Sequence, residues 1–156
     1  MSSGLQAFEI QLAVEPADLD RLGHVNNIAY MRWVQEAATA HWSAVAPAAD
    51  QAKVLWIVLR HEIDYLQQAF LSDGIVARTW VGKASRVRFE RHTELLRASD
   101  RAVLARSRTV WCPVDTEKHR PVAVSAEVRK LFSVAPVSGE TTAQTVASHA
   151  LEGERR

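Results

Sequence analysis

Residues able to take part in acid–base or nucleophilic chemistry are concentrated in one short stretch near the N-terminus. Two carboxylates, Asp18 and Asp20, are followed by Gly23, by His24 and by a pair of asparagines at the start of a predicted helix. A helix start offers unpaired N–H groups and the positive end of the helix dipole, which stabilise a carbonyl oxygen that gains negative charge. A nearby carboxylate could act as general base or nucleophile. The stretch therefore indicates acyl chemistry, although an Asp in such a loop also commonly caps a turn.

Other candidates for a reactive site are weaker. The six histidines show no metal-ligand spacing, and His61 is not followed by the second histidine of a zinc-protease motif. The lone cysteine, Cys112, lies in an apolar stretch typical of a small core residue. The sequence contains neither the G-x-S-x-G elbow of serine hydrolases nor a glycine-rich phosphate loop. We therefore expect no metal and no cofactor, and we interpret His41 as a core histidine.

The composition predicts one globular domain. The chain has 156 residues, of which 47% are hydrophobic and 24% charged, so it is long enough to bury a core. Its 19 basic and 18 acidic residues argue against a dedicated nucleic-acid-binding protein. The first ten residues lack the pattern of a signal peptide, and no stretch approaches the ~18 apolar residues of a membrane span. We expect a cytoplasmic protein with no membrane contact.

The predicted elements form an α+β domain. A helix is predicted over 28–46, ended by Pro47, and it is apolar around most of its circumference, which favours an enclosed helix. Period-2 alternation predicts strands over 7–14, 54–67, 75–83, 86–96 and 102–114, the last four as an antiparallel meander that the first strand joins. A sheet curled round one helix follows from this pattern. We predict a single domain over 1–132, ending in a short helix at 125–132, and a mobile tail over 133–156.

The stretch that begins at Asp18 resembles a known family motif. It reads D-x-D-x-x-G-H-V-N-N-x-x-Y up to Tyr30 and is similar to the opening motif of hot-dog-fold acyl-CoA thioesterases of the 4-hydroxybenzoyl-CoA thioesterase type. The resemblance runs from about Phe8 to Phe132 and includes Ile63-Asp64-Tyr65, Asp73-Gly74 and Arg120-Pro121. It implies the hot-dog fold, an antiparallel sheet wrapped around one long central helix, which agrees with the fold expected from the hydrophobic pattern.

The resemblance also implies hydrolysis of an acyl thioester to a free acid and a thiol. Asp20 would be the general base or the nucleophile, and these two roles stay open. The backbone around Gly23 and His24 would hold the thioester oxygen, while the side chains of His24 and Asn27 would line the site. The residues expected to contact the substrate as pocket wall are Val25 and Tyr30.

The substrate implied by the resemblance is an acyl-CoA. Nine basic and three acidic residues lie between Arg78 and Arg108. Arg86 and Arg88 share one face of the predicted 86–96 strand, with Arg91 on the other, so the pair could hold the phosphates of CoA or could simply face solvent. An open sheet edge is commonly paired, so we expect a homodimer or homotetramer with a continuous sheet and the site at the dimer interface.

Three alternative functions remain. Thioesterases that act on acyl carrier protein share the H-V-N-N run but carry Asn where this chain has Leu22, and they use Glu where it has Gln68, which favours an acyl-CoA enzyme. Enoyl-CoA hydratases of the same fold space their Asp and His as D-x-x-x-x-H, one residue wider than Asp20 and His24. A module that binds an acyl thioester or fatty acid without turnover would not need Asp20 beside a helix start.

Overall fold

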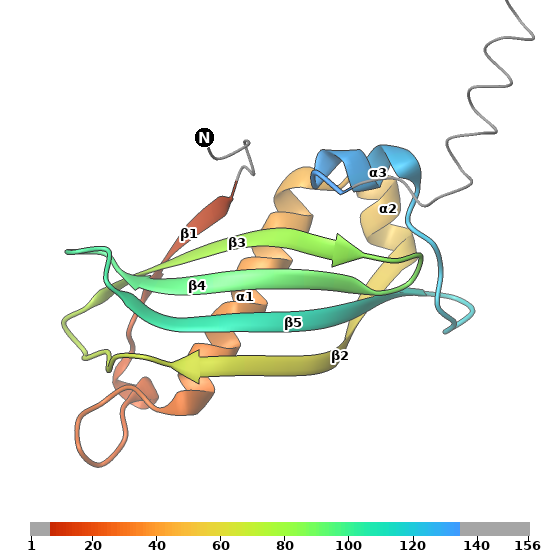
Figure 1. The fold of residues 1–156 in the computed structure, drawn as a ribbon. Coiled ribbons are helices and arrows are strands. Elements are labelled where there is room, and N and C mark those ends of the chain that lie inside the picture. The colour runs from red at the N-terminus through yellow and green to blue at the C-terminus, as the bar shows by residue number, and fades with distance from the viewer. Residues whose placement is uncertain (1–6, 135–156) are drawn as a thin grey trace, which may run out of the picture.

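The structure is a computed structural model that describes residues 7–134. One long helix, α1 (Asn27–Val45), lies across one face of a five-stranded antiparallel sheet (Figure 1). The strands are β1 (Phe8–Ala13), β2 (Val54–Tyr65), β3 (Gly74–Ala84), β4 (Phe89–Arg97) and β5 (Val103–Asp115). The short helices are η1 (Pro16–Asp18), α2 (Ala48–Lys53) and α3 (Ala126–Leu131). The predicted α+β class and the expected short helix at 125–132 are both confirmed.

Local signals set the two ends of α1. Asn26 is its N-cap, because the Asn26 side-chain oxygen accepts a hydrogen bond from Ala29 N at 2.9 Å. The helix ends before Pro47, as predicted, but Pro47 is also the N-cap of α2, which the sequence pattern did not predict. α2 is only six residues long and has no buried residue, so it lacks the apolar stripe that would have revealed it.

The strand order differs from the predicted meander of four. The order is β1-β3-β4-β5-β2, so β2 pairs with β5 at one edge and β1 joins the sheet beside β3 at the other. The meander prediction was wrong for β2 because residues 66–73 do not form a hairpin. They cross the sheet beside the start of α1, where Val25 N donates to Ala69 O at 2.9 Å. Ala69 is fully buried there.

The predicted strand over 86–96 begins later than expected. Ser85 N donates to Arg88 O at 2.8 Å, which closes a turn between β3 and β4, and β4 starts at Phe89. Arg86 and Arg88 therefore lie in an exposed turn, and the prediction that they project from one face of a strand was wrong. The alternation of residue types continues through this turn, so the pattern alone did not mark where pairing stops.

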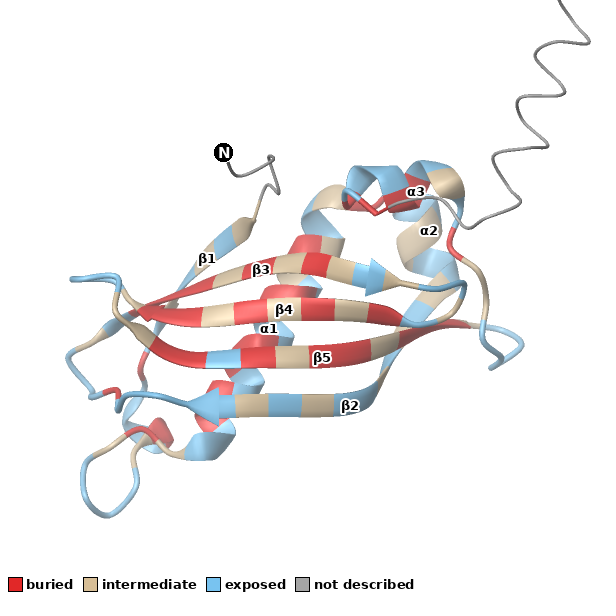
Figure 2. Cartoon of the chain, in the orientation of Figure 1, coloured by how far each residue is buried: buried red, intermediate tan, exposed pale blue. Residues whose placement is uncertain are grey.

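Only one side of α1 is enclosed. Its buried residues recur every three or four positions and face the sheet, as Figure 2 shows. Ile28 and Met31, which the all-round apolar pattern placed inside, are 77% and 39% exposed. Within one chain the sheet covers one face of the helix and leaves the opposite face exposed. Both side chains thus remain available for contact with another molecule.

The interior consists of two apolar clusters with a polar band between them. One cluster surrounds the first half of α1 and includes Trp33, Ile75 and Leu104. The second lies near the end of α1 and includes Phe89 and Phe132. Between them the sheet presents a row of buried polar side chains to the helix. They are Thr79, Arg91, Thr93, Ser107 and Thr109. Such a band is uncommon because each buried polar group needs a partner.

The predicted domain boundary falls close to the end of the described residues. Val134 is buried and packs in the second cluster, two residues beyond the boundary expected at 132. Residues 135–156 of the predicted tail and residues 1–6 of the predicted domain lie outside the described residues. The division into a domain and a tail stays a prediction.

Candidate active site

Asp20 organises the tight turn that precedes α1. Its Oδ1 accepts hydrogen bonds from Leu22 N at 2.9 Å and His24 N at 3.0 Å, and its own N–H donates to His24 O at 2.7 Å. Gly23 has φ +80°, the left-handed conformation that glycine adopts without strain. Oδ1 of Asp20 therefore caps the turn, which is the structural role that the sequence analysis gave as the alternative for an Asp in this loop. The exposed carboxylate keeps Oδ2 without a hydrogen bond to any described residue.

Asp18 has a structural role behind this turn. It is only 3% exposed, and its carboxylate accepts hydrogen bonds from Glu15 N at 2.8 Å and from Arg32 Nη2 at 2.7 Å. Its backbone oxygen accepts from Asn26 N at 2.8 Å. Both carboxylate oxygens are thus used to hold the loop against α1. Of the two aspartates, Asp20 is the one available to a substrate.

The unpaired backbone donors lie at the helix start and not in the turn. Gly23 N donates to Asp20 O at 3.1 Å and His24 N donates to the Asp20 carboxylate, so both amides are already engaged. Helix geometry leaves the N–H groups of the first helical residues, Asn27 and Ile28, without intrahelical acceptors. Neither amide has an acceptor among the described residues. These two amides, with the positive end of the helix dipole, are suited to an oxyanion.

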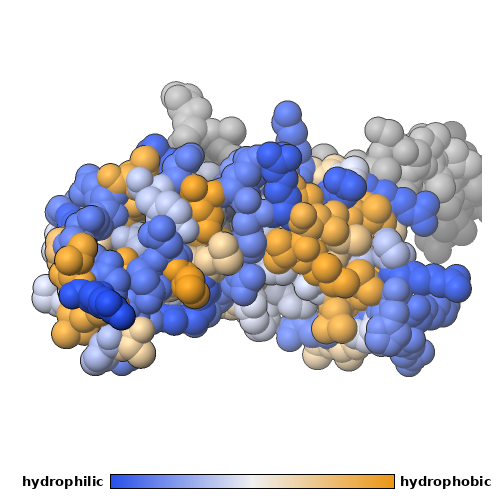
Figure 3. Space-filling model, turned by 90° about the horizontal axis from the view of Figure 1, so that it is seen from below, coloured by the Kyte–Doolittle hydropathy of each residue, from blue (hydrophilic) through white to orange (hydrophobic). Residues whose placement is uncertain are grey.

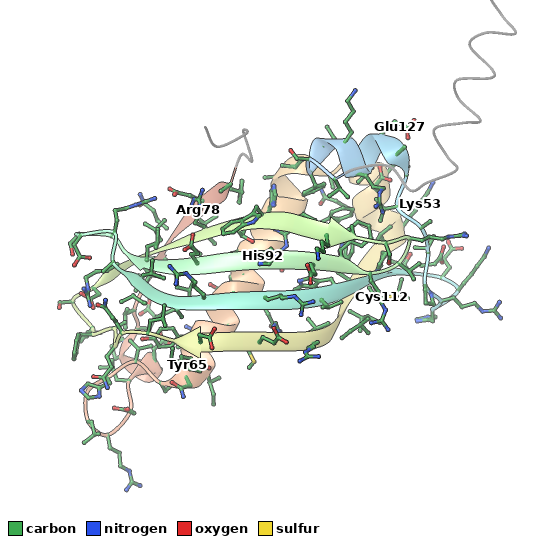
Figure 4. The ribbon with its side chains drawn as sticks, in the orientation of Figure 1. Lys53, Tyr65, Arg78, His92, Cys112 and Glu127 are labelled. Atoms are coloured by element: carbon green, nitrogen blue, oxygen red, sulfur yellow. The ribbon has the colours of Figure 1, made fainter. Side chains whose placement is uncertain are left out.

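Three rings surround the turn and the helix start. The His24 ring is half-buried and meets Phe70 edge-on, with ring centroids 5.4 Å apart. Tyr65, at the end of β2 beside the loop in Figure 4, donates a hydrogen bond to Asn27 O at 3.4 Å. The Asn27 residue itself is exposed. Phe70 was not among the predicted site residues, and its antiparallel bridge to His24 depends on the crossing segment 66–73.

Tyr30 and Val25 belong to the core beneath the site. Tyr30 is 2% exposed, and its hydroxyl donates to Gln67 O at 3.2 Å and accepts from Ala69 N at 3.0 Å. Burial raises the pKa of Tyr30 above its ordinary value. Val25 is 6% exposed and packs in the first apolar cluster. Both residues support the loop from below, and neither presents a free polar group to a ligand.

Arg86 and Arg88 lie at the opposite end of the sheet from Asp20 in the same chain. The turn that carries them is separated from the Asp20 loop by the length of β3, which is eleven residues or about 35 Å. Most other basic residues of the segment are in ion pairs, for example Arg78 with Glu94 at 3.1 Å. Arg86 and Arg88 make no ion pair with a described residue. One chain alone does not bring them to the loop.

A cavity of about 370 Å³ lies at that same end, between the second half of α1 and the sheet. Its wall is rich in aromatic side chains, which come from α1, β2, β4, β5 and the C-cap of α3: Trp42, Trp56, Phe89, Trp111 and Phe132. The volume is within the range of about 300–1,000 Å³ found for small-molecule sites.

The one buried cation of the polar band reaches the same cavity. Arg91 is 8% exposed, lines the cavity, and donates from Nη1 to His41 Nδ1 at 2.9 Å and to Thr79 Oγ1 at 3.1 Å. Burial, with a smaller contribution from the Arg91 charge, lowers the pKa of His41 to about 4, so this ring is neutral. His41 is the core histidine that the sequence predicted. Arg91 was missed, although its position two residues after Phe89 on an alternating strand places it on the helix side.

Among the described residues, no group of three or more His, Cys, Asp or Glu side chains could hold a metal ion. No helix in this part of the chain is long and apolar enough to cross a membrane.

Comparison with known proteins identifies the class of this fold. The model of the thioesterase-like superfamily matches residues 14–132. No curated protein matches the sequence. Many solved structures match, and they confirm the hot-dog fold expected from the motif.

Three of the similar structures are thioesterases by name. A 1,4-dihydroxy-2-naphthoyl-CoA thioesterase from Synechocystis has a TM-score of 0.69 at 18% identity, covering 81% of this chain and 96% of its own. A thioesterase from Thermus thermophilus, solved with coenzyme A and zinc, has a TM-score of 0.70 at 22% identity, covering 83% and 98%. A probable thioesterase from Escherichia coli has a TM-score of 0.66 at 20% identity, covering 79% and 94%.

The low pKa of His41 predicts a loss of stability in mild acid. Because the folded pKa (about 4) lies below the ordinary value of 6.5, stability is fully present above pH 6.5 and falls as the pH drops toward 4. We expect the free energy of unfolding to fall by about 2 kcal/mol from this group between pH 7.5 and 5. Urea titrations at fixed protein concentration would measure it. His41→Asn should remove this share of the pH dependence, and an unchanged slope in that variant would contradict the assignment.

Proposed function

The chain belongs to the thioesterase-like superfamily and is a thioester hydrolase, and on this premise we propose that it hydrolyses acyl-CoA with Asp20 as the reacting carboxylate. The observation that carries the proposal is the state of the Asp20 side chain. One oxygen fixes the turn before α1, while the other, on an exposed residue, has no hydrogen bond to a described residue. The helix that follows this turn starts with the unpaired amides of Asn27 and Ile28. The carboxylate is thereby held in position and keeps an oxygen for chemistry.

The arrangement supports two routes to the same products. In the first, Asp20 Oδ2 takes a proton from water as the water oxygen attacks the thioester carbonyl, the C–S bond breaks, and the proton passes to the leaving thiolate. In the second, Oδ2 attacks the carbonyl, the C–S bond breaks, and water then hydrolyses the mixed anhydride. In both, the amides of Asn27 and Ile28 stabilise the negative carbonyl oxygen. His24 and Phe70 form the wall beside it.

A second chain completes the site in this proposal. β2 is an edge strand, and three apolar residues on it, Leu55, Ile57 and Leu59, are about half exposed. Figure 3 looks onto this edge and shows hydrophobic residues gathered between hydrophilic ones. Exposed strand edges of this kind are commonly paired. We propose an isologous dimer in which β2 pairs with β2 of a second copy and continues the sheet.

Antiparallel pairing of β2 with its own copy would bring the two ends of the sheet together. A two-fold axis near the middle of Val54–Tyr65 sets Tyr65 of one chain opposite Val54 of the other. The Asp20 loop of one chain then lies near the end of the other chain that carries the cavity and the Arg86–Arg88 turn. The aromatic cavity would receive the acyl group, and the two arginines would meet the phosphates of CoA. The same dimer could serve a thioester of acyl carrier protein.

The first prediction concerns Asp20. Asp20→Asn keeps an oxygen that can accept from Leu22 N and His24 N but removes the charge, so the turn should survive while kcat falls by ~10² or more. Thiol release from acyl-CoA and a circular dichroism spectrum measure the two effects.

Asp18→Asn is the matched control, because Asp18 lies behind the turn. It should lower turnover much less than Asp20→Asn does. Near-wild-type turnover in Asp20→Asn would remove Asp20 from the mechanism.

The second prediction concerns the β2 edge. Ile57 is 49% exposed on this edge, and Ile57→Lys places a charge there. The substitution should break the dimer. It should also abolish most activity, because the proposed site needs both chains. Light scattering and thiol release on the same samples measure both. Leu131→Lys, at a leucine 51% exposed on α3, should leave the dimer intact. A wild-type monomer that is stable and active at micromolar concentration would be incompatible with this assembly.

The third prediction concerns the CoA end of the substrate. Arg88→Ala should raise KM for acyl-CoA several-fold with little change in kcat, because it removes a phosphate contact and leaves the reacting groups in place. The wild-type protein and Arg88→Ala should hydrolyse a truncated thioester without the nucleotide equally well. Arg106→Ala, which loses an outer-face ion pair with Glu94, is the control and should not change KM. If Arg88→Ala lowers kcat/KM equally for acyl-CoA and for the truncated thioester, Arg88 has a structural role.

A further inference from the structure

The wall of the aromatic cavity has an unusual charge composition. Its ionisable residues are two arginines, Arg91 and Arg129, and no aspartate or glutamate lines it. Arg129 lies over the Phe89 ring and donates to Ser85 O at 2.9 Å. Two further lining residues, Trp56 and Trp111, have buried indole N–H groups with no hydrogen-bond partner among the described residues. The wall is therefore rich in donors and poor in anionic acceptors.

Arg91 is the central group because its charge is buried without an anion. Both hydrogen bonds that it makes to described residues start from Nη1, and their acceptors, His41 Nδ1 and Thr79 Oγ1, are uncharged. No carboxylate of the described residues forms an ion pair with it. An arginine has five N–H donors, so those on Nε and Nη2 remain without a protein acceptor in this part of the chain.

The polar band holds the guanidinium in one orientation. Thr79 Oγ1 donates to His92 O at 2.9 Å and lies 3.0 Å from Thr93 Oγ1, so its position is fixed from the sheet. The His41 ring is stacked on Phe8, with centroids 4.8 Å apart, and meets Phe132 edge-on. A cation held this firmly away from any carboxylate carries an uncompensated cost of burial. An anion that entered the cavity would offset that cost.

We propose that this cavity is a binding site for an apolar ligand that ends in a carboxylate, with the carboxylate on Arg91. The planar guanidinium can pair with a carboxylate through two parallel N–H bonds, which suits the donors that Nε and Nη2 leave open. Trp42, Phe89 and Phe132 contact the apolar body. The cavity volume of about 370 Å³ accommodates a medium-length or aromatic acid.

The carboxylate that binds Arg91 can come from two kinds of molecule. The carboxylate can be the far end of the acyl group of a thioester, which rests on the proposed function, or it can belong to a free acid. The first source makes Arg91 a specificity residue for acyl groups with a polar end. The second makes the cavity a site for a free acid and needs no thioester. Measurements of binding and of turnover separate the two.

The binding measurement uses decanoate and 1-decanol, which share a chain and differ in the terminal charge. Trp42, Trp56 and Trp111 line the cavity, so occupancy should change tryptophan emission. We expect wild-type protein to bind decanoate at least tenfold more tightly than decanol. Arg91→Met, which keeps the bulk and removes the charge, should abolish that preference, and Arg91→Lys should restore part of it. Arg106→Gln, at an exposed arginine on β5 that does not line the cavity, is the control and should behave as wild type.

A second variant covers the case in which Arg91→Met does not fold. Thr39 is exposed on α1 and lines the cavity, so Thr39→Glu adds a carboxylate at the wall without disturbing the core. It should weaken decanoate binding several-fold and leave decanol binding unchanged. Equal affinity for decanoate and decanol in wild type, or a preference that survives both variants, would overturn the proposal.

The turnover measurement compares decanoyl-CoA with the CoA monothioester of the ten-carbon dicarboxylic acid. A higher kcat/KM for the second substrate that is lost in Arg91→Met identifies the acyl group as the source. Equal kcat/KM values together with the decanoate preference identify a free acid. If neither thioester is hydrolysed, the proposed function fails, while the binding measurement still decides whether Arg91 receives a carboxylate.

Discussion

The hydroxyl of Tyr30 joins the start of α1 to the crossing segment 66–73, which is distant in the sequence, and the position of the Asp20 loop depends on this link. It accepts from the buried amide of Ala69 and donates to the carbonyl of Gln67, so the crossing segment 66–73 is held against the first turn of α1. Val25 N binds Ala69 O, and His24 forms a bridge with Phe70, so the loop is fixed to the same segment. The candidate carboxylate thus sits on a rigid support.

The polar band in the interior has a second consequence for function. It separates an apolar cluster under the Asp20 loop from one around the aromatic cavity, so the two ends of a single chain carry different chemistry. Arg91 donates a hydrogen bond to Thr79, but the Arg91 cation has no anionic partner among the described residues. A single chain therefore holds the proposed reacting carboxylate and the proposed ligand cavity at opposite ends. The proposed dimer through β2 would unite them.

Local features were predictable from the sequence, and long-range pairing was not. The Asn26 cap, the end of α1 before Pro47 and the concentration of polar residues around Asp20 follow from side-chain chemistry within a few positions. The place of β2 beside β5 depends on the crossing segment at Ala69, which no alternation pattern reveals. The strand alternation indicates which face Arg91 is on, but its hydrogen bond to His41 depends on what α1 presents to the sheet.

The central claim is that the Asp20 loop supports turnover and not only binding. The most direct measurement is the release of free thiol by the wild-type protein from a panel of short, medium, long and aromatic acyl-CoA thioesters. The account predicts turnover of at least one member, with a rate that depends on acyl length because the cavity volume is only about 370 Å³. Tight binding of the acyl-CoA thioesters with no thiol release from any member would contradict it and would identify a binding module.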